Sequence, residues 1–317
     1  MAYDVLIIGA GPAGLSAAVY AGRAALKTLL LERSEAGGQM AITLDIANFP
    51  GFPDGIDGAE LSARMRRHAE RFGVEIKQAE ARSIERVENG FLVAGDGERF
   101  FGRTAIIATG SLPRLLDVPG EKELRGRGVS YCATCDGPFF RNKEVLVVGG
   151  GDAALKESLH LVKFASRLTI VHRRDTFRGE KIYQKDILNH PKIEVLWNTI
   201  VLSINGRQSV ETVTLRNVMS NRIFERPTQG VFIFIGSIPN TGLLASLLPE
   251  SAAGPVPANA DMMTRIPGLF AIGDVRMGSY RQIATAIGDG AIAAMAAERY
   301  LLHPSALSRS DNAQSLA

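Results

Sequence analysis

The two cysteines of the chain, Cys132 and Cys135, are three positions apart in a sequence of 317 residues that contains no others. Two cysteines at this spacing can close a small, reducible disulfide, and a CxxC motif often lowers a thiol pKa so that a thiolate is available. Thiolates exchange disulfides by direct attack on sulfur. Because no further cysteine is present, no other thiol of the chain competes with this pair. We therefore interpret Cys132 and Cys135 as a redox-active dithiol.

Two other uses of a CxxC pair have less support. Tetrahedral zinc needs four ligands, and the chain has no second CxxC and no paired ligand spacing among its five histidines. A purely structural disulfide is a weak alternative, because so short a loop removes little chain entropy. We therefore predict no metal site. A redox-active pair does require an electron source, and the elements around it predict one.

The first such element is a dinucleotide-binding fingerprint near the N-terminus. Residues 4–8 predict a buried strand, residues 9–14 match GxGxxG, residues 13–25 predict a helix, and the strand predicted over 28–31 ends at Glu32. The three glycines permit a tight turn, a close approach to a pyrophosphate and close packing of helix on strand, and the acid at the end of the second strand binds a ribose hydroxyl. This site is expected to take an adenine dinucleotide without a 2′-phosphate.

A second fingerprint of the same length follows the dithiol. After a strand predicted over 144–148, residues 149–154 match GxGxxA, and a helix is predicted over 153–164. The next strand, over 167–171, ends at His172-Arg173-Arg174, with Arg178 close behind. In both units the terminal residue lies 23 positions after the first glycine. A basic cluster in place of the acid favours the 2′-phosphate of NADPH. The alternative for the arginines is a solvated cationic turn.

Later segments return to the first unit. Separate strands are predicted over 99–101 and 104–110, the second of them a buried strand that returns to the sheet. Residues 230–236 are predicted to do the same in the second unit, and residues 268–274 to form another buried strand, which ends in Gly-Asp. An alanine-rich helix follows over about 283–301. The predicted fold class is α/β, with two Rossmann-like dinucleotide-binding domains of the three-layer ββα type, one inserted in the other. The first domain comprises 1–113 and 245–304, the inserted domain with the dithiol 114–244, and a flexible tail 305–317.

The amino-acid composition makes some classes of partner and location less expected than others. Apolar residues make up 46% of the chain and charged residues 22%, and the net charge is +3 with no basic run. These values are typical of a globular protein and give no reason to expect a nucleic-acid partner. No apolar run reaches transmembrane length, so no membrane partner is expected. With no export signal and a reducible dithiol, we expect a cytoplasmic protein.

These motifs together resemble the low-molecular-weight thioredoxin reductases, FAD enzymes of the bacterial and plant type. The resemblance covers about residues 4–302. It rests on motifs that occur in the family's order, at 9–14, 37–39, 48–51, 132–137, 149–154, 172–174, 273–274 and 281–282. It implies FAD and NADPH as cofactors, an NADPH domain inserted in the FAD domain, thioredoxin as the disulfide substrate, and a homodimer.

The resemblance also implies roles for the residues around the dithiol. Cys135 is the flavin-side sulfur, Cys132 is the interchange sulfur that attacks the partner's disulfide, and Asp136 moves protons for the dithiol. Without the family, Asp136 would be interpreted as a loop cap. The implied electron path runs from NADPH to FAD, to the Cys132–Cys135 disulfide and then to thioredoxin, with a rotation of the inserted domain between the two half-reactions.

The FAD site is expected to contain Gly9, Gly11, Pro12, Ala13, Gly14, Glu32, Gly38, Gln39, Asn48, Thr109, Gly110, Gly273, Asp274, Arg281, Gln282 and Ile283. The NADPH site is expected to contain Gly149, Gly151, Asp152, Ala153, Ala154, His172, Arg173, Arg174, Arg178 and Gly236.

Three positions depart from the family pattern. Lys156-Glu157 stands where two acids are usual, Ala47 stands where a glutamate is usual, and residues 288–291 read GDGA where a run with threonine and cysteine is usual. Lys156 changes a charge beside the expected nicotinamide site, which puts the efficiency of NADPH use in question.

Rival functions on the same fold are a ferredoxin-fed reductase, a dithiol oxidase that passes electrons to oxygen, and a redox-sensing flavoprotein without turnover. The first two have no need for the arginines at 173, 174 and 178. Steady-state oxidation of NADPH with thioredoxin separates a sensor from an enzyme.

Overall fold

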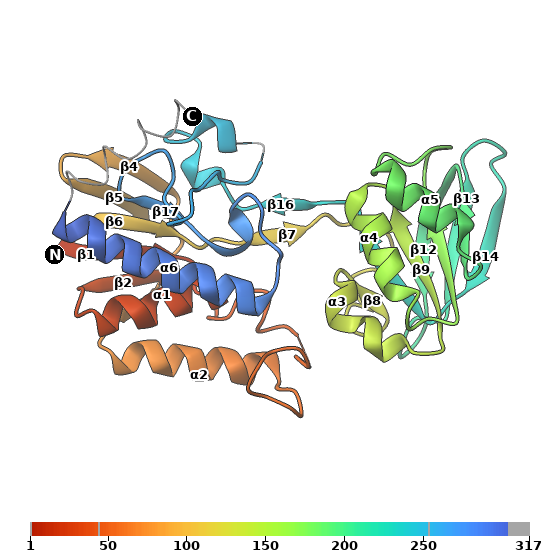
Figure 1. Ribbon diagram of the computed structural model, residues 1–317, viewed down its shortest axis with the longest axis horizontal. Helices are drawn as coiled ribbons and strands as arrows, with labels where there is room; N and C mark the ends of the chain where they lie inside the picture. Colours follow the sequence, from red (N-terminus) through yellow and green to blue (C-terminus); the bar gives the residue numbers. More distant parts are fainter. Residues whose placement is uncertain (1, 44, 253, 304–317) are drawn as a thin grey trace. The chain divides into compact units, whose positions relative to one another are not determined.

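The computed structural model of the protein describes residues 2–43, 45–252 and 254–303 (Figure 1). The chain forms two compact units. The first combines 1–112 with 238–317, and the second comprises 113–237. The second crossing between the units therefore lies at 237/238, seven residues before the boundary of 244 expected from the sequence. The tail predicted over 305–317 lies outside the described residues.

The first unit is built on a seven-stranded sheet with helices packed against it (Figure 1). The path through the sheet is β3-β2-β1-β6-β5-β4, and β17 also pairs with β6. All pairs are parallel except β4–β5 and β5–β6, which are antiparallel. The strands are β1 (Ala2–Ile8), β2 (Thr28–Glu32), β3 (Glu75–Gln78), β4 (Ser83–Val87), β5 (Gly90–Gly95), β6 (Glu98–Ile107) and β17 (Leu269–Ala271). The helices are α1 (Pro12–Arg23), α2 (Gly58–Arg71) and α6 (Ile283–Leu302), and the short 3-10 turns are η2 (Gly242–Leu244), η3 (Pro249–Ser251) and η4 (Gly273–Val275).

Both faces of the central strand β1 are buried. Val5 and Ile7 join the core formed with α1 and α6, whereas Leu6 and Ile8 join a second core on the other face of the sheet. A parallel strand covered on both faces has a continuous apolar sequence instead of alternating residues. This arrangement explains why residues 5–8 are all apolar.

One expectation about the strands of the first unit was wrong. The segments 99–101 and 104–110 were expected to be separate strands, but β6 runs unbroken from Glu98 to Ile107. Its first half forms a hairpin with β5, and its second half pairs in parallel with β1. Gly102 lies at the join, where a Cβ atom would come within 2.5 Å of Leu6 Cγ. The glycine therefore serves close packing within a strand and does not mark a break.

The second unit has three layers. Its five-stranded parallel sheet has the order β11-β10-β9-β15-β8. The helices pack on one face of this sheet, and the antiparallel sheet β12-β13-β14 packs on the other. The parallel strands are β8 (Val129–Ser130), β9 (Glu144–Gly149), β10 (Arg167–Val171), β11 (Ile193–Leu196) and β15 (Gly230–Phe234). The other elements are α3 (Ala133–Asp136), η1 (Gly137–Phe140), α4 (Asp152–Leu161), α5 (Lys181–Asn189), β12 (Thr199–Asn205), β13 (Thr212–Asn217) and β14 (Ile223–Pro227). The predicted α/β fold class is confirmed.

The two crossings of the chain pair with each other. β7 (Ser111–Pro113) and β16 (Ser237–Pro239) form a two-stranded sheet. Asn240 binds the chain just before β7 through three hydrogen bonds. Its side chain donates to Thr109 O at 2.8 Å, its backbone N–H donates to Gly110 O at 2.9 Å, and its carbonyl accepts from the Thr109 hydroxyl at 2.7 Å. The two crossings therefore leave the first unit from one fixed point.

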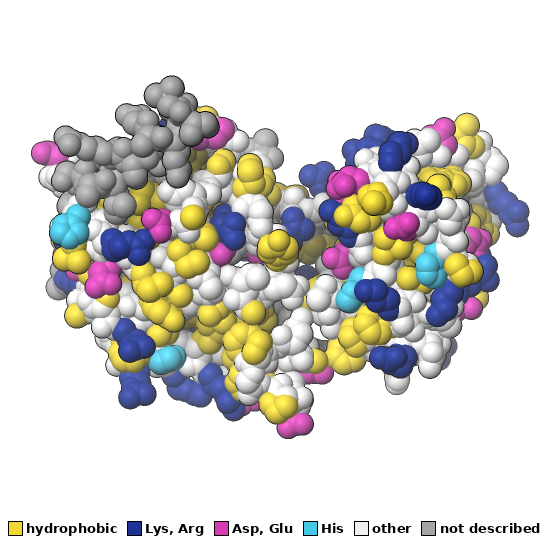
Figure 2. Space-filling model, in the orientation of Figure 1, with side chains coloured by type: hydrophobic (Ala, Val, Ile, Leu, Met, Phe, Trp, Pro, Cys, Tyr) yellow, Lys and Arg dark blue, Asp and Glu magenta, His cyan; other side chains and the backbone are white. Residues whose placement is uncertain are grey.

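Surface charge is mixed on both units. Figure 2 shows basic and acidic side chains interspersed over the visible face, in keeping with a net charge of +3. Among the described residues, no helix is both long and apolar enough to cross a membrane.

Candidate functional site

The first fingerprint folds into a turn that only glycine permits at two of its positions. Gly9 has φ +106°, and a Cβ there would lie 2.4 Å from Ala108 O. A Cβ on Gly14 would lie 1.9 Å from Gly9 O, so this glycine allows α1 to pack on the turn. Gly11 differs, because a Cβ there meets no atom within 4 Å. Pro12 begins α1 without the need for a backbone N–H. Open space beside Gly11 at the N-terminus of α1 fits a pyrophosphate.

Glu32 lies at the end of β2 and faces this turn. Its Oε2 accepts the Ala10 backbone N–H at 2.7 Å, and its Oε1 accepts the Ser34 N–H at 3.1 Å. A carboxylate oxygen has a second lone pair. These hydrogen bonds therefore orient the acid and leave acceptor capacity for a ribose hydroxyl.

The remaining residues expected at the FAD site come from three segments of the first unit. Asn48 Nδ2 donates to Gln282 Oε1 at 3.2 Å, which joins the loop after β2 to the residue that caps α6. Phe49 and Ile283 pack on the same small core cluster. Gly38, with φ +56°, would place a Cβ 3.5 Å from Gly11 Cα, so the neighbouring Gln39 also lies near the fingerprint turn.

Asp274 follows β17 and is largely withdrawn from water. Burial raises the pKa of this carboxyl, and the charge of Asp289 adds to the rise, whereas a hydrogen bond from Ser279 and the charge of Arg281 lower it. Ser279 Oγ donates to Asp274 Oδ1 at 3.0 Å and accepts the Arg281 N–H at 3.1 Å. A largely buried carboxylate that accepts a hydrogen bond from Ser279 fits the hydroxyl groups of a ribityl chain.

The second fingerprint repeats the steric pattern of the first. Gly149 has φ +151°, and a Cβ there would come within 2.5 Å of Phe234 O and 2.7 Å of Ala154 Cβ. Gly151 matches Gly11, since a Cβ there meets nothing within 4 Å. Asp152 begins α4, and its Oδ1 accepts the Glu180 N–H at 2.7 Å. Space beside Gly151 at the start of an α-helix again fits a pyrophosphate.

The arginine cluster and His172 have different surroundings. Arg173, Arg174 and Arg178 are exposed at the carboxyl end of β10, where an anion can reach them. Arg178 is bound to the fingerprint turn by its backbone N–H, which donates to Gly150 O at 2.8 Å. His172 is only 5% exposed. Its Nε2 lies 3.0 Å from Thr176 O, and a Cβ on Gly150 would come within 2.3 Å of its ring. His172 therefore supports the turn, and the arginines form its accessible charge.

Two further NADPH candidates flank these groups. Ala153 is exposed on the first turn of α4. Gly236, with φ +112°, accepts the Arg114 N–H at 3.0 Å, next to the β16 crossing. Lys156 places Nζ 3.6 Å from Glu180 Oε1 and 4.8 Å from the Tyr183 ring centroid. The Glu180 carboxylate offsets the charge that Lys156 introduces.

The dithiol is oxidised. Cys132 and Cys135 are joined by a disulfide with a Cα–Cα distance of 5.3 Å. Cys132 caps the single turn α3, and its sulfur accepts the Cys135 N–H at 3.1 Å. Both cysteines are partly exposed, whereas Ala133 between them is fully buried in the second-unit core. The buried alanine anchors the loop, and both cysteines remain partly exposed.

Asp136 lies directly after the dithiol, and its environment favours the protonated form. Burial raises the pKa of Asp136, and a hydrogen bond from Ser130 lowers it. Ser130 Oγ donates to Asp136 Oδ2 at 2.5 Å and accepts the Cys132 N–H at 3.1 Å. Sequence reasoning missed Ser130. Its only signal is a hydroxyl six residues before an acid, in a strand of two residues that is too short to predict.

Sequence reasoning also missed a buried anchor beside the dithiol. Glu121 is 0% exposed. It accepts the backbone N–H groups of Leu116 and Asp117 at 3.0 and 2.7 Å and the Tyr131 hydroxyl at 2.8 Å. Burial of the Tyr131 side chain, together with its hydrogen bond to Glu121, raises the pKa of Tyr131 far above its usual range. Because Tyr131 precedes Cys132, the anchor ties the dithiol loop to the start of the second unit.

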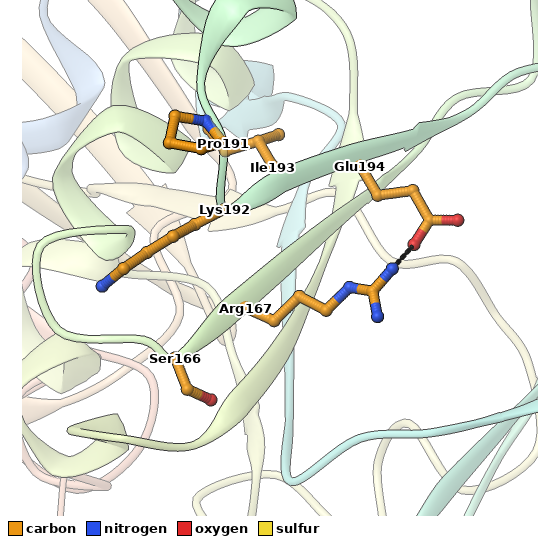
Figure 3. Close-up of a pocket in the computed structure, with 6 residues that line it drawn as sticks. All are labelled: Ser166, Arg167, Pro191, Lys192, Ile193 and Glu194. Carbon is orange, nitrogen blue, oxygen red and sulfur yellow. Dashed lines mark hydrogen bonds and ion pairs between the residues drawn. The ribbon is translucent and has the colours of Figure 1, made fainter.

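A shallow hollow elsewhere on the second unit does not belong to this site. Figure 3 shows it at the start of β10 and β11, lined by Ser166, Arg167, Pro191, Lys192, Ile193 and Glu194. Arg167 Nη2 donates to Glu194 Oε2 at 2.7 Å. In open α/β sheets ligands bind beyond the carboxyl ends of the strands. The hollow lies at the opposite edge, away from the arginine cluster.

The chain has two units with dinucleotide-binding fingerprints, and the second also carries an oxidised dithiol beside a partly buried carboxyl group. These features define a disulfide oxidoreductase that binds two dinucleotides. The model of the pyridine nucleotide-disulphide oxidoreductase family matches residues 3–290, and the chain belongs to that family. Membership, together with the relatives below, implies that this oxidoreductase uses FAD and NADPH. The open space at Gly11 and Gly151 and the arginine cluster fit these two groups.

The relatives are similar over nearly the whole chain. A thioredoxin reductase of Bacillus subtilis is 46% identical over 302 residues, which cover 94% of this chain and 95% of the relative. One of Treponema pallidum is 44% identical over 94% of this chain and 97% of its own. The crystal structure of thioredoxin reductase from Streptococcus pyogenes is 44% identical and superposes with a TM-score of 0.90, covering 95% of this chain and 98% of that one.

Alanine at Gly11 and at Gly151 is expected to separate the two nucleotide sites. Both glycines have extended backbone that alanine adopts, so the stability of the apoprotein should stay the same or rise by up to ~1 kcal/mol. The added methyl group fills the space expected for a pyrophosphate. Gly11→Ala should weaken FAD binding at least about tenfold, and Gly151→Ala should weaken NADPH binding to a similar extent.

Titration of the apoprotein with FAD and of the flavin-loaded protein with NADPH measures both effects, and each variant is the control for the other. Gly14→Ala should behave differently and lower the melting temperature, because its methyl group would meet Gly9 O. Unchanged nucleotide affinity in both Gly11→Ala and Gly151→Ala would contradict the assignment.

The pKa of Asp136 predicts a pH dependence of stability. Since burial raises the pKa in the folded protein, the folded state binds the proton more tightly than the unfolded state. The free energy of unfolding should therefore fall as pH rises from the unfolded pKa of about 3.9 through the folded pKa. Ser130→Ala removes a hydrogen bond that lowers this pKa, so the fall should extend to higher pH.

Chemical denaturation over a series of pH values measures this dependence. Asp136→Asn cannot ionise and is the matched control, which should lack the fall. If the unaltered protein and Asp136→Asn keep a constant difference in stability at every pH, Asp136 does not titrate as assigned. In activity assays, Asp136→Asn should lower turnover by about 10²- to 10⁴-fold, the usual contribution of a positioned acid–base group.

Proposed function

We propose that the protein is a thioredoxin-disulfide reductase that uses NADPH as its electron donor. The observation that carries the proposal is the Cys132–Cys135 disulfide, next to Asp136, in the unit whose fingerprint ends in three exposed arginines. An arginine cluster in place of a ribose-binding acid recognises a 2′-phosphate, which distinguishes NADPH from NADH. The acceptor, thioredoxin, is proposed because the relatives are thioredoxin reductases.

The first unit binds FAD in this proposal. Gly11 and the N-terminus of α1 would face its pyrophosphate, Glu32 would accept a hydrogen bond from its ribose, and Asp274 would bind its ribityl chain. Thr109, Gly110, Arg281, Gln282 and the start of α6 complete the site. When bound, FAD supplies the chemistry that converts hydride transfer from NADPH into electron transfer to sulfur.

The dithiol carries out the exchange with thioredoxin. In the reduced protein the Cys132 thiolate attacks one sulfur of the thioredoxin disulfide, which forms a mixed disulfide and releases one thioredoxin thiolate. Cys135 then attacks Cys132 Sγ, which restores the Cys132–Cys135 disulfide and releases the second thiolate. Asp136 takes a proton from the dithiol and delivers it to a leaving thiolate. Its raised pKa suits an acid that holds its proton closer to neutral pH than an exposed aspartate.

The inserted unit, which is compact over 113–237, rotates between the two half-reactions. Support comes from the two paired crossings, β7 and β16, which leave the first unit at Thr109 and Asn240. Short crossings that meet at one point are suited to a hinge. We further propose a homodimer, on the resemblance alone, and a cytoplasmic location, because a reducible dithiol functions in a reducing compartment.

Steady-state kinetics test the proposal. The flavin-loaded protein should oxidise NADPH only when oxidised thioredoxin is present, and thioredoxin thiols should appear at two for each NADPH consumed. Activity with reduced ferredoxin in place of NADPH, or oxygen consumption with a small dithiol, would identify a different enzyme. Absence of turnover with several thioredoxins, in protein that holds its flavin, would refute the proposal.

A further inference from the structure

A buried ion pair lies beside the turn that carries Asp274. Asp289 is on the second turn of α6, and its side chain is 8% exposed; that of its partner, Arg276, is 20% exposed. Arg276 Nε lies 2.7 Å from Asp289 Oδ2, and Arg276 Nη2 lies 3.0 Å from Asp289 Oδ1, so the ion pair is bidentate. A carboxylate buried to this extent is tolerated only when it is paired and hydrogen-bonded.

Asp289 also binds the other end of the same turn. Its Oδ2 accepts the Gly273 N–H at 3.0 Å. One carboxylate therefore holds both Gly273 and Arg276, the residues on either side of Asp274 and Val275. Gly273 has φ +66°, a conformation that the surrounding contacts must maintain, and a Cβ there would lie 2.9 Å from Ala13 Cβ.

The helix that carries Asp289 is itself fixed against the first fingerprint. Figure 1 shows α6 beside α1, and a Cβ on Gly290 would lie 2.3 Å from Ala13 O. Ser16 Oγ on α1 donates to Ile287 O on α6 at 2.8 Å. The position of Asp289 is therefore set by the helix that begins at the expected pyrophosphate site.

Further hydrogen bonds connect the Asp289–Arg276 pair to the rest of the loop that precedes α6. Arg276 also donates to Met277 O at 2.9 Å, and Ser279 joins Asp274 to the Arg281 N–H. Through these bonds Asp289 on α6 holds the start of the segment 273–282.

We propose that the Asp289–Arg276 pair is a latch that holds the Gly273–Arg276 turn in the conformation in which Asp274 binds FAD. The two residues are positioning residues that act through Asp274. The proposal rests on the proposed FAD site, and it predicts that flavin affinity depends on a charge pair within α6 and the loop that precedes it.

Asp289→Asn and Arg276→Met test the latch. Each should weaken FAD binding to the apoprotein by on the order of 10- to 100-fold, because removal of one partner leaves the other charge buried and unpaired. Titration followed by flavin fluorescence measures this loss. Arg276→Lys keeps the charge but not the bidentate geometry and should recover part of the affinity. Asp261→Asn removes an exposed ion pair between Asp261 and Arg299 of the same helix and should leave FAD affinity within about twofold.

Hydrogen exchange of the apoprotein provides a readout that does not involve the flavin. The Gly273 amide should exchange at least about tenfold faster in Asp289→Asn, while the Leu15 amide in α1, which donates to Gly11 O, keeps its protection. Equal loss of protection at both amides would show general destabilisation and overturn the latch, as would unchanged exchange at Gly273. If the unaltered protein binds no FAD, the proposed function is wrong, and exchange at Gly273 still decides whether the pair holds the turn.

Discussion

Replacement of Cys135 by serine is expected to abolish the reduction of thioredoxin, with a loss of at least about 10³-fold, while FAD stays bound. Cys135 is one of only two cysteines, so no other thiol in the chain can re-form the disulfide with Cys132. Serine has nearly the shape of cysteine but cannot form a disulfide or take part in exchange. The FAD candidates lie in the first unit and the dithiol in the second, which is why flavin content should not change.

The measurement is NADPH-dependent formation of thioredoxin thiols, with flavin content determined from the absorbance of the purified protein. Cys132→Ser is the matched partner and should be equally inactive. The two variants should differ in alkylation of the NADPH-reduced protein: the single thiol left in Cys135→Ser is the interchange sulfur, expected to be the more accessible one. Retained thioredoxin reduction in Cys135→Ser would show that the dithiol is assigned wrongly.

Replacement of Arg173 and Arg174 by alanine is expected to remove the preference for NADPH over NADH. Both side chains are exposed at the carboxyl end of β10, and their exposed guanidinium groups can each form charge-assisted hydrogen bonds with a 2′-phosphate. Such bonds contribute about 1.5–3 kcal/mol each. The KM for NADPH should therefore rise by on the order of 100-fold or more, whereas kcat/KM with NADH, which lacks the phosphate, should change little.

Steady-state kinetics with both nucleotides measure this preference, and an anaerobic titration of the coloured protein with NADPH and then NADH tests it without thioredoxin. Arg207→Ala, an exposed arginine of the same unit in the turn between β12 and β13, is the control and should leave both values unchanged. An equal loss with NADPH and NADH would indicate that the arginines support the fold of the turn and do not recognise the phosphate. His172 is not suitable for this test, because its buried ring supports Gly150.

Much of the fold was predictable because its signals are local. The two fingerprints place glycines where the chain itself requires them, as the 1.9 Å approach of a Gly14 Cβ to Gly9 O illustrates. Strand segments covered on both faces, such as residues 5–8 of β1, have uninterrupted apolar sequences. The break expected between 101 and 104 was wrong because Gly102 serves contact with a neighbouring strand, and sequence alone does not distinguish that use of glycine from a turn.

The sequence by itself determined the chemistry of the dithiol, the two matched nucleotide-binding units and the difference between an acid at one and arginines at the other. All of these depend on residue type at short spacing. Only the tertiary structure showed the hydrogen bonds of Ser130 to Asp136 and of Tyr131 to Glu121. It also showed that Asn240 is hydrogen-bonded to Thr109, which lies 131 residues earlier in the chain, and that Asp289 is neutralised by Arg276. The physical reason is that a buried polar group must find a partner wherever the fold brings one, and that partner leaves no periodic or spaced pattern in the chain.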